Sequence, residues 1–306
     1  MATLNGADWI GAQIRSILAS QGVSVRIVIS DDGSRDDTLE RAQEAGAGAV
    51  SVLPSPGGLG AAQNFLHLIR HADLSGADYV ALSDQDDIWK PEKLARAISK
   101  LGAADAYSCD VTAVWPDGRE KYIRKSYPQK RYDHLFEYGS AGSTFVFPIK
   151  SALRLRALLD DMAPRDLARV DSHDWLLYAA LRQDGLRWVI DPWSGVQYRQ
   201  HGSNHRGAWD GVAALRERVE RARNGWFRCQ VLSIASLTHA DCPVVDYMRT
   251  PKLSKIGVPM RYFLACRRRP RDGWVLLLLL LLAGMFPRMA TRTYVQNETP
   301  AKGGRA

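Results

Sequence analysis

The amino-acid sequence predicts an α/β protein with a mostly parallel central sheet, followed by a helical region toward the C-terminus. Two observations support this class. Short apolar runs alternate with segments of helical periodicity through residues 7–83, and strands that alternate with helices form parallel sheets. Acidic turns directly follow two of these apolar runs, at the strand ends where α/β proteins place their ligands.

The first predicted helix covers residues 7–20, where Ile10, Ile14 and Ile17 recur on one face. Beyond it, the periodicity changes repeatedly between strand and helix. It predicts strands at 23–29, 49–53, 78–83, 111–115, 143–147 and 186–190, and helices at 36–45, 60–72 and 173–182. Residues 118–138, rich in Lys, Arg and Tyr, are expected to form an irregular insertion.

The acidic loop at residues 82–91 is the most informative segment, because it places Asp84, Asp86 and Asp87 directly after an apolar run. In an extended backbone Asp84 and Asp86 project to the same side, so they can share one divalent cation, Mg²⁺ or Mn²⁺, whose other positions suit phosphate oxygens. The alternative is an acidic turn in which Asp87 caps a helix that has Pro91 near its first turn. A second acidic turn, residues 30–38, follows another predicted strand and favours the functional interpretation.

Composition excludes several classes of protein. The 306 residues are 46% hydrophobic and 9% aromatic, enough for a sizeable core. Four cysteines without a Cys-x-x-Cys pair indicate neither a zinc site nor a disulfide framework, and they fit a reducing cytoplasm. The net charge of +8 is concentrated in residues 216–228 and 261–271 rather than spread evenly, and no nucleic-acid motif accompanies it, so no nucleic-acid partner is expected.

A short apolar run near the C-terminus indicates a membrane partner instead. Residues 274–286 number 13, whereas a spanning helix needs about 20, so we expect an interfacial helix. The preceding Arg267-Arg268-Arg269-Pro270-Arg271 would lie among anionic headgroups. A buried core helix is the alternative. Residues 212–226 carry apolar side chains at helical spacing and predict an amphipathic helix. The start of the chain lacks the features of a signal peptide.

Six motifs resemble those of the inverting GT-A glycosyltransferases of family 2. They span roughly the first two thirds of the chain and are most similar to bacterial rhamnosyltransferases of surface-polysaccharide assembly. The matching residues are Thr3-Leu4-Asn5-Gly6, Asp31-Asp32-Gly33-Ser34, Gly60 with Asn64-Phe65, Ser83-Asp84-Gln85-Asp86-Asp87-Ile88-Trp89, His173-Asp174-Trp175 and Tyr198-Arg199-Gln200-His201-Gly202.

The resemblance implies a role for each candidate residue. Asp32 would accept a hydrogen bond from the imide N–H of uracil or thymine, Asp86 would be the principal metal ligand, and His201 would join it. Asp174 would be the general base that deprotonates the acceptor hydroxyl. The other expected donor-binding residues are Thr3, Asn5, Asp31, Ser34, Gly60, Asn64, Asp84, Gln85 and Arg199. Turn formation by Asp32 and helix capping by Asp174 are the structural alternatives.

The resemblance also implies a domain organisation. Residues 1–207 would form the GT-A catalytic domain, with a Rossmann-like sheet, residues 208–290 a helical membrane-associating region, and residues 291–306 a disordered tail. In the family the Thr-x-Asn-Gly motif ends a full apolar strand, but here only Met1-Ala2-Thr3 remains of that strand. We therefore expect a truncated first strand or a misassigned start.

These features predict an inverting, metal-dependent transferase that moves L-rhamnose from dTDP-L-rhamnose onto a lipid-linked glycan. It would act as a peripheral protein at the cytoplasmic face of the bacterial inner membrane. A UDP-hexose or UDP-galactofuranose donor is an alternative within the same class. A non-catalytic protein that binds nucleotide sugar or membrane within a polysaccharide assembly complex is an alternative of another class, which the short first strand encourages.

Overall fold

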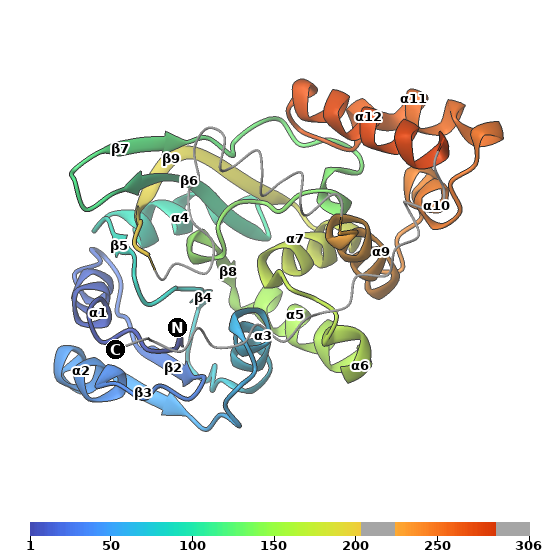
Figure 1. Cartoon of the computed structure of the whole chain (residues 1–306). Helices are drawn as coiled ribbons and strands as arrows, with labels where there is room; N and C mark the ends of the chain where they lie inside the picture. Colours follow the sequence, from blue (N-terminus) through green and yellow to red (C-terminus); the bar gives the residue numbers. More distant parts are fainter. Residues whose placement is uncertain (203–223, 286–306) are drawn as a thin grey trace.

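A computed structural model describes residues 1–202 and 224–285 (Figure 1). Most of the amphipathic helix expected over residues 212–226 lies outside the described residues, and so does the expected tail at 291–306. The described chain forms two sheets with helices around them, and a group of C-terminal helices lies to one side (Figure 1).

The first sheet is parallel, as the sequence predicts. Its order is β1 (Ala2–Thr3), β2 (Ile27–Asp31) and β3 (Val50–Leu53). Ala2 pairs with Ser30 and Thr3 with Asp31, so the short first strand contributes to the sheet. The expected helices are found as α1 (Ile10–Leu18), α2 (Thr38–Gly46) and α3 (Ala61–His71).

The second sheet is mixed, so the expectation of a mostly parallel sheet is wrong for this half. Its order is β4-β8-β6-β9-β5, with β7 paired to β6, and within the described part of this sheet only the β6–β9 pair is parallel. The strands are β4 (Tyr79–Ala81), β5 (Ile88–Trp89), β6 (Ala106–Val114), β7 (Glu120–Ile123), β8 (Val146–Pro148) and β9 (Trp188–Arg199).

A tight turn explains why a strand forms in a segment that the sequence predicts to be irregular. Residues 118–138 were expected to be irregular, yet β7 lies within them and pairs with β6 as a hairpin. Pro116, Asp117 and Gly118 form the turn, in which Gly118 has a φ of 83° and donates its N–H to the carbonyl of Trp115. Pro-Asp-Gly between two extended segments is a turn signal, and it brings neighbouring strands together antiparallel.

The remaining helices surround the second sheet or form the C-terminal group. They are α4 (Lys93–Leu101), α5 (Ile149–Asp161), α6 (Pro164–Leu167), α7 (His173–Gln183), α9 (Trp226–Leu237), α10 (Pro243–Arg249), α11 (Gly257–Tyr262) and α12 (Pro270–Met285), with 3₁₀ turns at Asp133–Leu135, Gly142–Thr144, Leu253–Lys255 and Phe263–Ala265.

The C-terminal helices share a core with the rest of the protein. Val231 and Ile234 of α9 and Leu276 of α12 are buried in one cluster with Phe136 and with Trp175 of α7. The apolar run therefore packs one side of α12 against the protein. Within the described residues, no helix is long and apolar enough to cross a membrane.

Candidate functional site

The two sheets adjoin at the carboxyl ends of β1, β2 and β4. The amide of Ala2 donates to the carbonyl of Ser83 over 3.3 Å, which brings the acidic loop beside β1. The Gln85 side chain then forms two hydrogen bonds of 2.9 Å with the backbone N–H and C=O of Leu4. A Cβ at Gly6 would collide with the Gln85 amide, so a larger residue there would displace this side chain from Leu4. Gln85 thus joins two of the sequence motifs.

The turn after β2 is organised by Asp31. Its carboxylate accepts hydrogen bonds from the hydroxyls of Thr3 (2.7 Å) and Ser34 (2.6 Å) and from the amides of Gly33 and Ser34. Asn5 completes the cluster. Its backbone N–H donates to Ser34 Oγ over 2.8 Å, and its side-chain Oδ1 accepts from the backbone N–H of Arg35 over 2.9 Å. Four of the candidate donor-binding residues therefore shape one rigid turn.

Asp32 connects this turn to the glycine-rich segment before α3. Its two carboxylate oxygens accept the N–H groups of Leu59 (2.6 Å) and Gly60 (2.7 Å), and Gly60 has a φ of 78°. A carboxylate has about four acceptor sites, so a ligand N–H can still be accommodated. Asn64 lies further in: its amide bonds the hydroxyl and the carbonyl of Ser30, and its side chain is buried.

The acidic loop meets the end of β9 at Asp86. Asp86 Oδ2 lies 3.0 Å from Nε2 of His201, whose ring stacks on Trp9 with centroids 3.9 Å apart. The guanidinium of Arg199 donates to the carbonyl oxygens of Asp86 and, over 3.1 Å, of Trp9. Arg199 therefore holds the loop and the start of α1 in place. Trp9, which the sequence did not single out, orients His201.

Negative charge is concentrated in this loop. Burial, together with the nearby carboxylates of Asp86 and Asp174, raises the pKa of Asp84 to about 7. Burial likewise raises the pKa of Asp87, with Asp84 and Asp86 adding to the shift. Asp174, distant in sequence, is therefore near enough to interact with Asp84 of the acidic loop. Like-charged carboxylates in a buried site are stabilised by a cation.

Asp86 and His201 would supply two ligands to a divalent cation, and the remaining ligands would be substrate oxygens or water. Within residues 1–202 and 224–285, no group of three His, Cys, Asp or Glu side chains forms a complete ligand set. Mg²⁺ in phosphate-transferring enzymes is commonly bound by one or two protein groups together with substrate phosphates. The donor set of Asp86 and His201 is compatible with this arrangement.

Asp174 lies in the first turn of α7, largely buried at 9% exposure. Its Oδ1 accepts hydrogen bonds from the Ser172 hydroxyl and the Trp175 amide. Among the described residues no hydrogen bond is made to Oδ2, which leaves this oxygen for a substrate hydroxyl. Gly142 packs below, where a Cβ would collide with the His173 ring and approach the Cβ of Asp174 to 3.4 Å. The N-cap position of α7 belongs to Ser172, so Asp174 is a first-turn carboxylate that binds one free amide and keeps its second oxygen for the candidate catalytic role.

The loop before Asp174 is held by α9. Trp226 Nε1 donates to Asp171 Oδ2 over 2.7 Å, and Gln230 bonds the Asp171 amide (3.0 Å) and the Arg169 carbonyl (2.8 Å). The ring of Trp175 stacks on Phe227. The C-terminal helices therefore help to position the candidate base.

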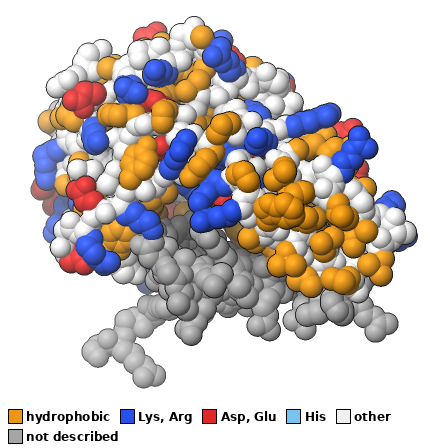
Figure 2. Space-filling view, turned by 90° about the horizontal axis from the view of Figure 1, so that it is seen from above, with side chains coloured by type: hydrophobic (Ala, Val, Ile, Leu, Met, Phe, Trp, Pro, Cys, Tyr) orange, Lys and Arg blue, Asp and Glu red, His pale blue; other side chains and the backbone are white. Residues whose placement is uncertain are grey.

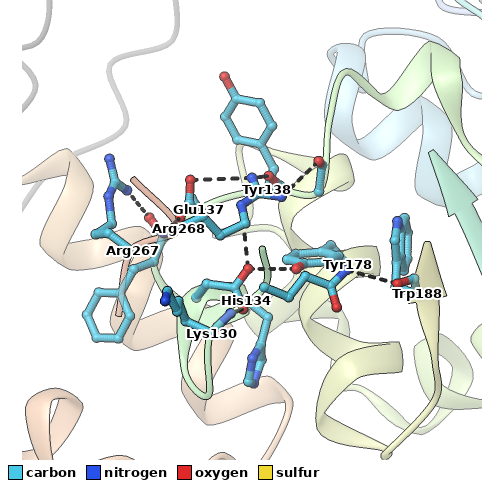
Figure 3. A network of polar contacts seen from close by, with 12 residues as sticks. Lys130, His134, Glu137, Tyr138, Tyr178, Trp188, Arg267 and Arg268 are labelled. Atoms are coloured by element: carbon cyan, nitrogen blue, oxygen red, sulfur yellow. Dashed lines mark hydrogen bonds and ion pairs between the residues drawn. The ribbon is translucent and has the colours of Figure 1, made fainter. Parts of the chain in front are cut away.

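A buried ionic network joins the start of α12 to α7 (Figure 3). Arg268 is 3% exposed and lies 3.5 Å from Asp133 and 3.3 Å from Glu137. Asp133, also buried, accepts a hydrogen bond of 2.7 Å from the Tyr178 hydroxyl and pairs with Arg182 at 3.5 Å. The expectation that this arginine run lies among headgroups is therefore wrong for Arg268, which neutralises internal carboxylates instead.

His134, in the same segment, gives the fold a pH dependence. Its Nε2 contacts Gln183 Oε1 at 3.2 Å, and burial lowers its pKa to about 4. The unfolded chain, with an ordinary histidine pKa of about 6.5, binds more protons between these values, so stability falls as the pH drops from 6.5 to 4. We expect protonation of His134 in the unfolded chain to lower the free energy of unfolding by about 2 kcal/mol between pH 7 and pH 5. Denaturant unfolding of His134→Gln should show a correspondingly smaller loss, and an unchanged loss would contradict this account.

Comparison with known proteins identifies the family. Residues 1–162 match the family model described as glycosyl transferase family 2. The chain is 33% identical over 289 residues to the dTDP-rhamnosyl transferase RfbG of Shigella flexneri, covering 92% of this chain and 99% of that protein. The chain belongs to glycosyl transferase family 2. This glycosyltransferase is also 27% identical over 219 residues to the succinoglycan biosynthesis protein ExoO of Rhizobium meliloti, covering 65% of this chain and 59% of that protein.

Solved structures show the same GT-A-like fold. The glycosyltransferase superposes on S. aureus TarS 1-349 with a TM-score of 0.53 at 13% identity, over 95% of this chain and 87% of TarS 1-349. It superposes on the mannosyltransferase PcManGT of Pyrobaculum calidifontis, solved with GDP-Man and Mn²⁺, with a TM-score of 0.50 at 15% identity, over 94% of this chain and 86% of the other. At these identities the likeness concerns the fold.

Proposed function

We propose that this glycosyltransferase transfers L-rhamnose from dTDP-L-rhamnose, with inversion, to a lipid-linked saccharide acceptor. The observation that carries the proposal is the proximity of Asp84, Asp86 and Asp174 in a site whose acidic loop is joined through Gln85 to Leu4, next to the turn that Asp31 organises. Similarity to the dTDP-rhamnosyl transferase RfbG over 92% of the chain favours this donor.

The pyrimidine of the donor would bind at Asp32. Both Asp32 oxygens already accept backbone N–H groups, which fixes the carboxylate plane before the nucleotide arrives. An imide N–H is present in both thymine and uracil and absent from cytosine, so this contact disfavours a cytidine nucleotide without separating dTDP from UDP. A UDP-sugar donor therefore remains the second candidate, and it is favoured by the structural neighbour TarS, solved with UDP-GlcNAc.

The diphosphate would lie against the acidic loop. Asp86 and His201 would hold Mg²⁺ or Mn²⁺, and this cation would neutralise the charge that develops on the leaving diphosphate. Arg199 keeps the Asp86 backbone in position through its carbonyl contacts. The half-buried carboxyl of Asp84 lies near Asp86 and Asp174, where the sugar ring would be bound.

Asp174 would act as the general base. Its Oδ2 takes the proton of the acceptor hydroxyl as the hydroxyl oxygen forms its bond to the anomeric carbon. The bond between that carbon and the diphosphate oxygen breaks at the same time, and dTDP leaves with the electron pair. The two hydrogen bonds on Oδ1 hold the carboxylate in one orientation during this step. Attack opposite the leaving group gives inversion.

The acceptor is proposed from the family resemblance. A lipid-linked saccharide confines the reaction to a membrane surface, and we place the enzyme as a peripheral protein at the cytoplasmic face of the inner membrane. The group of C-terminal helices, with its excess of arginine, is compatible with this location.

Donor binding with and without metal tests the proposal. We expect dTDP-L-rhamnose with Mn²⁺ to bind more tightly than UDP-glucose, UDP-galactose or GDP-mannose, as measured by calorimetry, and a chelator to weaken the binding.

Asp86→Ala should lower the transfer rate about a hundredfold, because the charge that develops on the leaving diphosphate loses its stabilisation. Asp37→Ala, on the exposed start of α2, is the matched control. Metal-independent binding, or full activity of Asp86→Ala, would refute the metal role, and a preference for a UDP-sugar would establish the second candidate.

A further inference from the structure

The outer side of α12 is apolar and exposed. Trp274, Val275 and Leu278 are 60%, 56% and 58% exposed, and Leu282 is 41% exposed. On a helix these positions lie on one side, while Leu276 and Leu280 face the protein interior. The leucine run therefore contains more apolar side chains than the core of the protein uses.

The apolar surface continues onto the preceding segment. Leu253, Met260 and Leu264 are 59%, 58% and 46% exposed. Leu264 packs against Gly273, next to Trp274, and the Trp274 ring lies 4.6 Å from that of Phe263. We call the exposed set the C-terminal apolar face: Leu253, Met260, Leu264, Trp274, Val275, Leu278 and Leu282. Figure 2 shows hydrophobic side chains gathered at the end of the molecule formed by α11 and α12, with Lys and Arg side chains near its margin.

The charges around this face are almost all positive. Residues 252–285 contain seven basic side chains, Lys252, Lys255, Arg261, Arg267, Arg268, Arg269 and Arg271, and one acidic side chain, Asp272. Arg268 is turned inward, Arg267 donates to the carbonyl of Phe136, and Arg269 and Arg271 lie near Asp272. Lys252, Lys255, Arg261 and Arg271 are exposed. The basic side chains available to a partner are thus interleaved with the exposed apolar ones.

We propose that the C-terminal apolar face docks on an anionic phospholipid surface, with α12 lying in the interface. Apolar side chains mixed with Lys and Arg, together with an exposed Trp, match a bilayer interface, where the apolar groups enter the acyl boundary and the cations remain among the phosphates. The inference deepens the proposed function by naming the lipid-facing residues, and it rests on that function in placing the enzyme at a membrane. It replaces Arg267 and Arg268 with Lys252, Lys255 and Arg261 as the headgroup contacts.

Vesicle co-sedimentation of the full chain tests the inference, with no donor or acceptor present. We expect binding to vesicles of phosphatidylcholine containing phosphatidylglycerol, weak binding to phosphatidylcholine alone, and weaker binding at high salt. Charge reversal of Lys252 and Arg261 to Glu should each lower the vesicle affinity about tenfold or more. Leu278→Glu should reduce the binding to a similar extent.

Matched controls come from other surfaces. Leu153→Glu, 48% exposed on α5, and Arg165→Glu, with a side chain 87% exposed on α6, should leave vesicle binding unchanged. Thermal unfolding should show that each variant is folded. Equal binding by Leu278→Glu and wild type would overturn the inference, and so would a vesicle-independent dimer that Leu278→Glu dissociates. Calorimetric donor binding is measured separately, so failure of the lipid inference is distinguishable from failure of the proposed transfer.

Discussion

We expect Asp174→Asn to lower the rate of transfer about a thousandfold while donor affinity changes little. The amide is nearly isosteric but cannot take the proton of the acceptor hydroxyl, and general base catalysis contributes about 10²- to 10⁴-fold. The Oδ1 oxygen, which accepts from Ser172 and the Trp175 amide, can be reproduced by the amide oxygen, so α7 should begin in the same way. Initial rates at saturating acceptor, together with calorimetric donor binding, measure the two effects separately.

Asp166→Asn is the matched control for this variant. Asp166 lies on α6, shortly before the same loop, with a side chain 40% exposed and two long contacts to Arg165 and Arg169. Its rate should equal that of the wild type. If Asp174→Asn retained full activity with the control also unchanged, Asp174 would be a helix-capping residue alone, and the base would have to be sought among the other carboxylates of the acidic loop.

The parallel half of the fold was accessible from sequence because its information is local. Apolar runs for β2 and β3 and the helical faces of α1 and α3 each lie within a few consecutive residues. The mixed half depends on pairings between distant strands, such as β6 with β9, which periodicity does not encode. The β6–β7 hairpin carried a local signal in Pro116-Asp117-Gly118, but the charged residues that follow it concealed the strand.

The residues of the candidate site also fall into two groups, those that carry a sequence motif and those that do not. Motifs singled out Asp32, Asp86 and Asp174, and in the structure the last two both interact with the half-buried Asp84. Positioning groups such as Trp9 and Ser172 carry no motif of their own, because an aromatic or a serine gains its role from the residue that it meets after folding. Asn64 and Gln85 matched the motifs as donor-binding residues, yet the described contacts of their side chains are to Ser30 and Leu4. Their roles in donor binding stay predictions.

Arg268 could not have been assigned from sequence, because it lies in a run of three arginines with different surroundings. We expect Arg268→Ala to lower the free energy of unfolding by about 3 kcal/mol, since removing one member of a buried ion pair leaves an uncompensated charge. Asp133 would keep Tyr178 and Arg182 as partners, which holds the loss near the lower end of the usual range. The carbonyls of Tyr138 and Gly139 would also lose their donor. Urea unfolding monitored by circular dichroism measures the change.

Arg271→Ala, in the same basic run, is the control for this effect. Its side chain is 69% exposed and its contact with Asp272 is 3.4 Å, so we expect a change of at most about 0.5 kcal/mol. Arg268→Lys should recover part of the loss, because lysine keeps the charge but lacks the planar fork that reaches Glu137 and the two carbonyls. Equal unfolding free energies for Arg268→Ala and Arg271→Ala would mean that the network contributes nothing. A large difference would show that the C-terminal helices are joined energetically to α7, which carries Asp174.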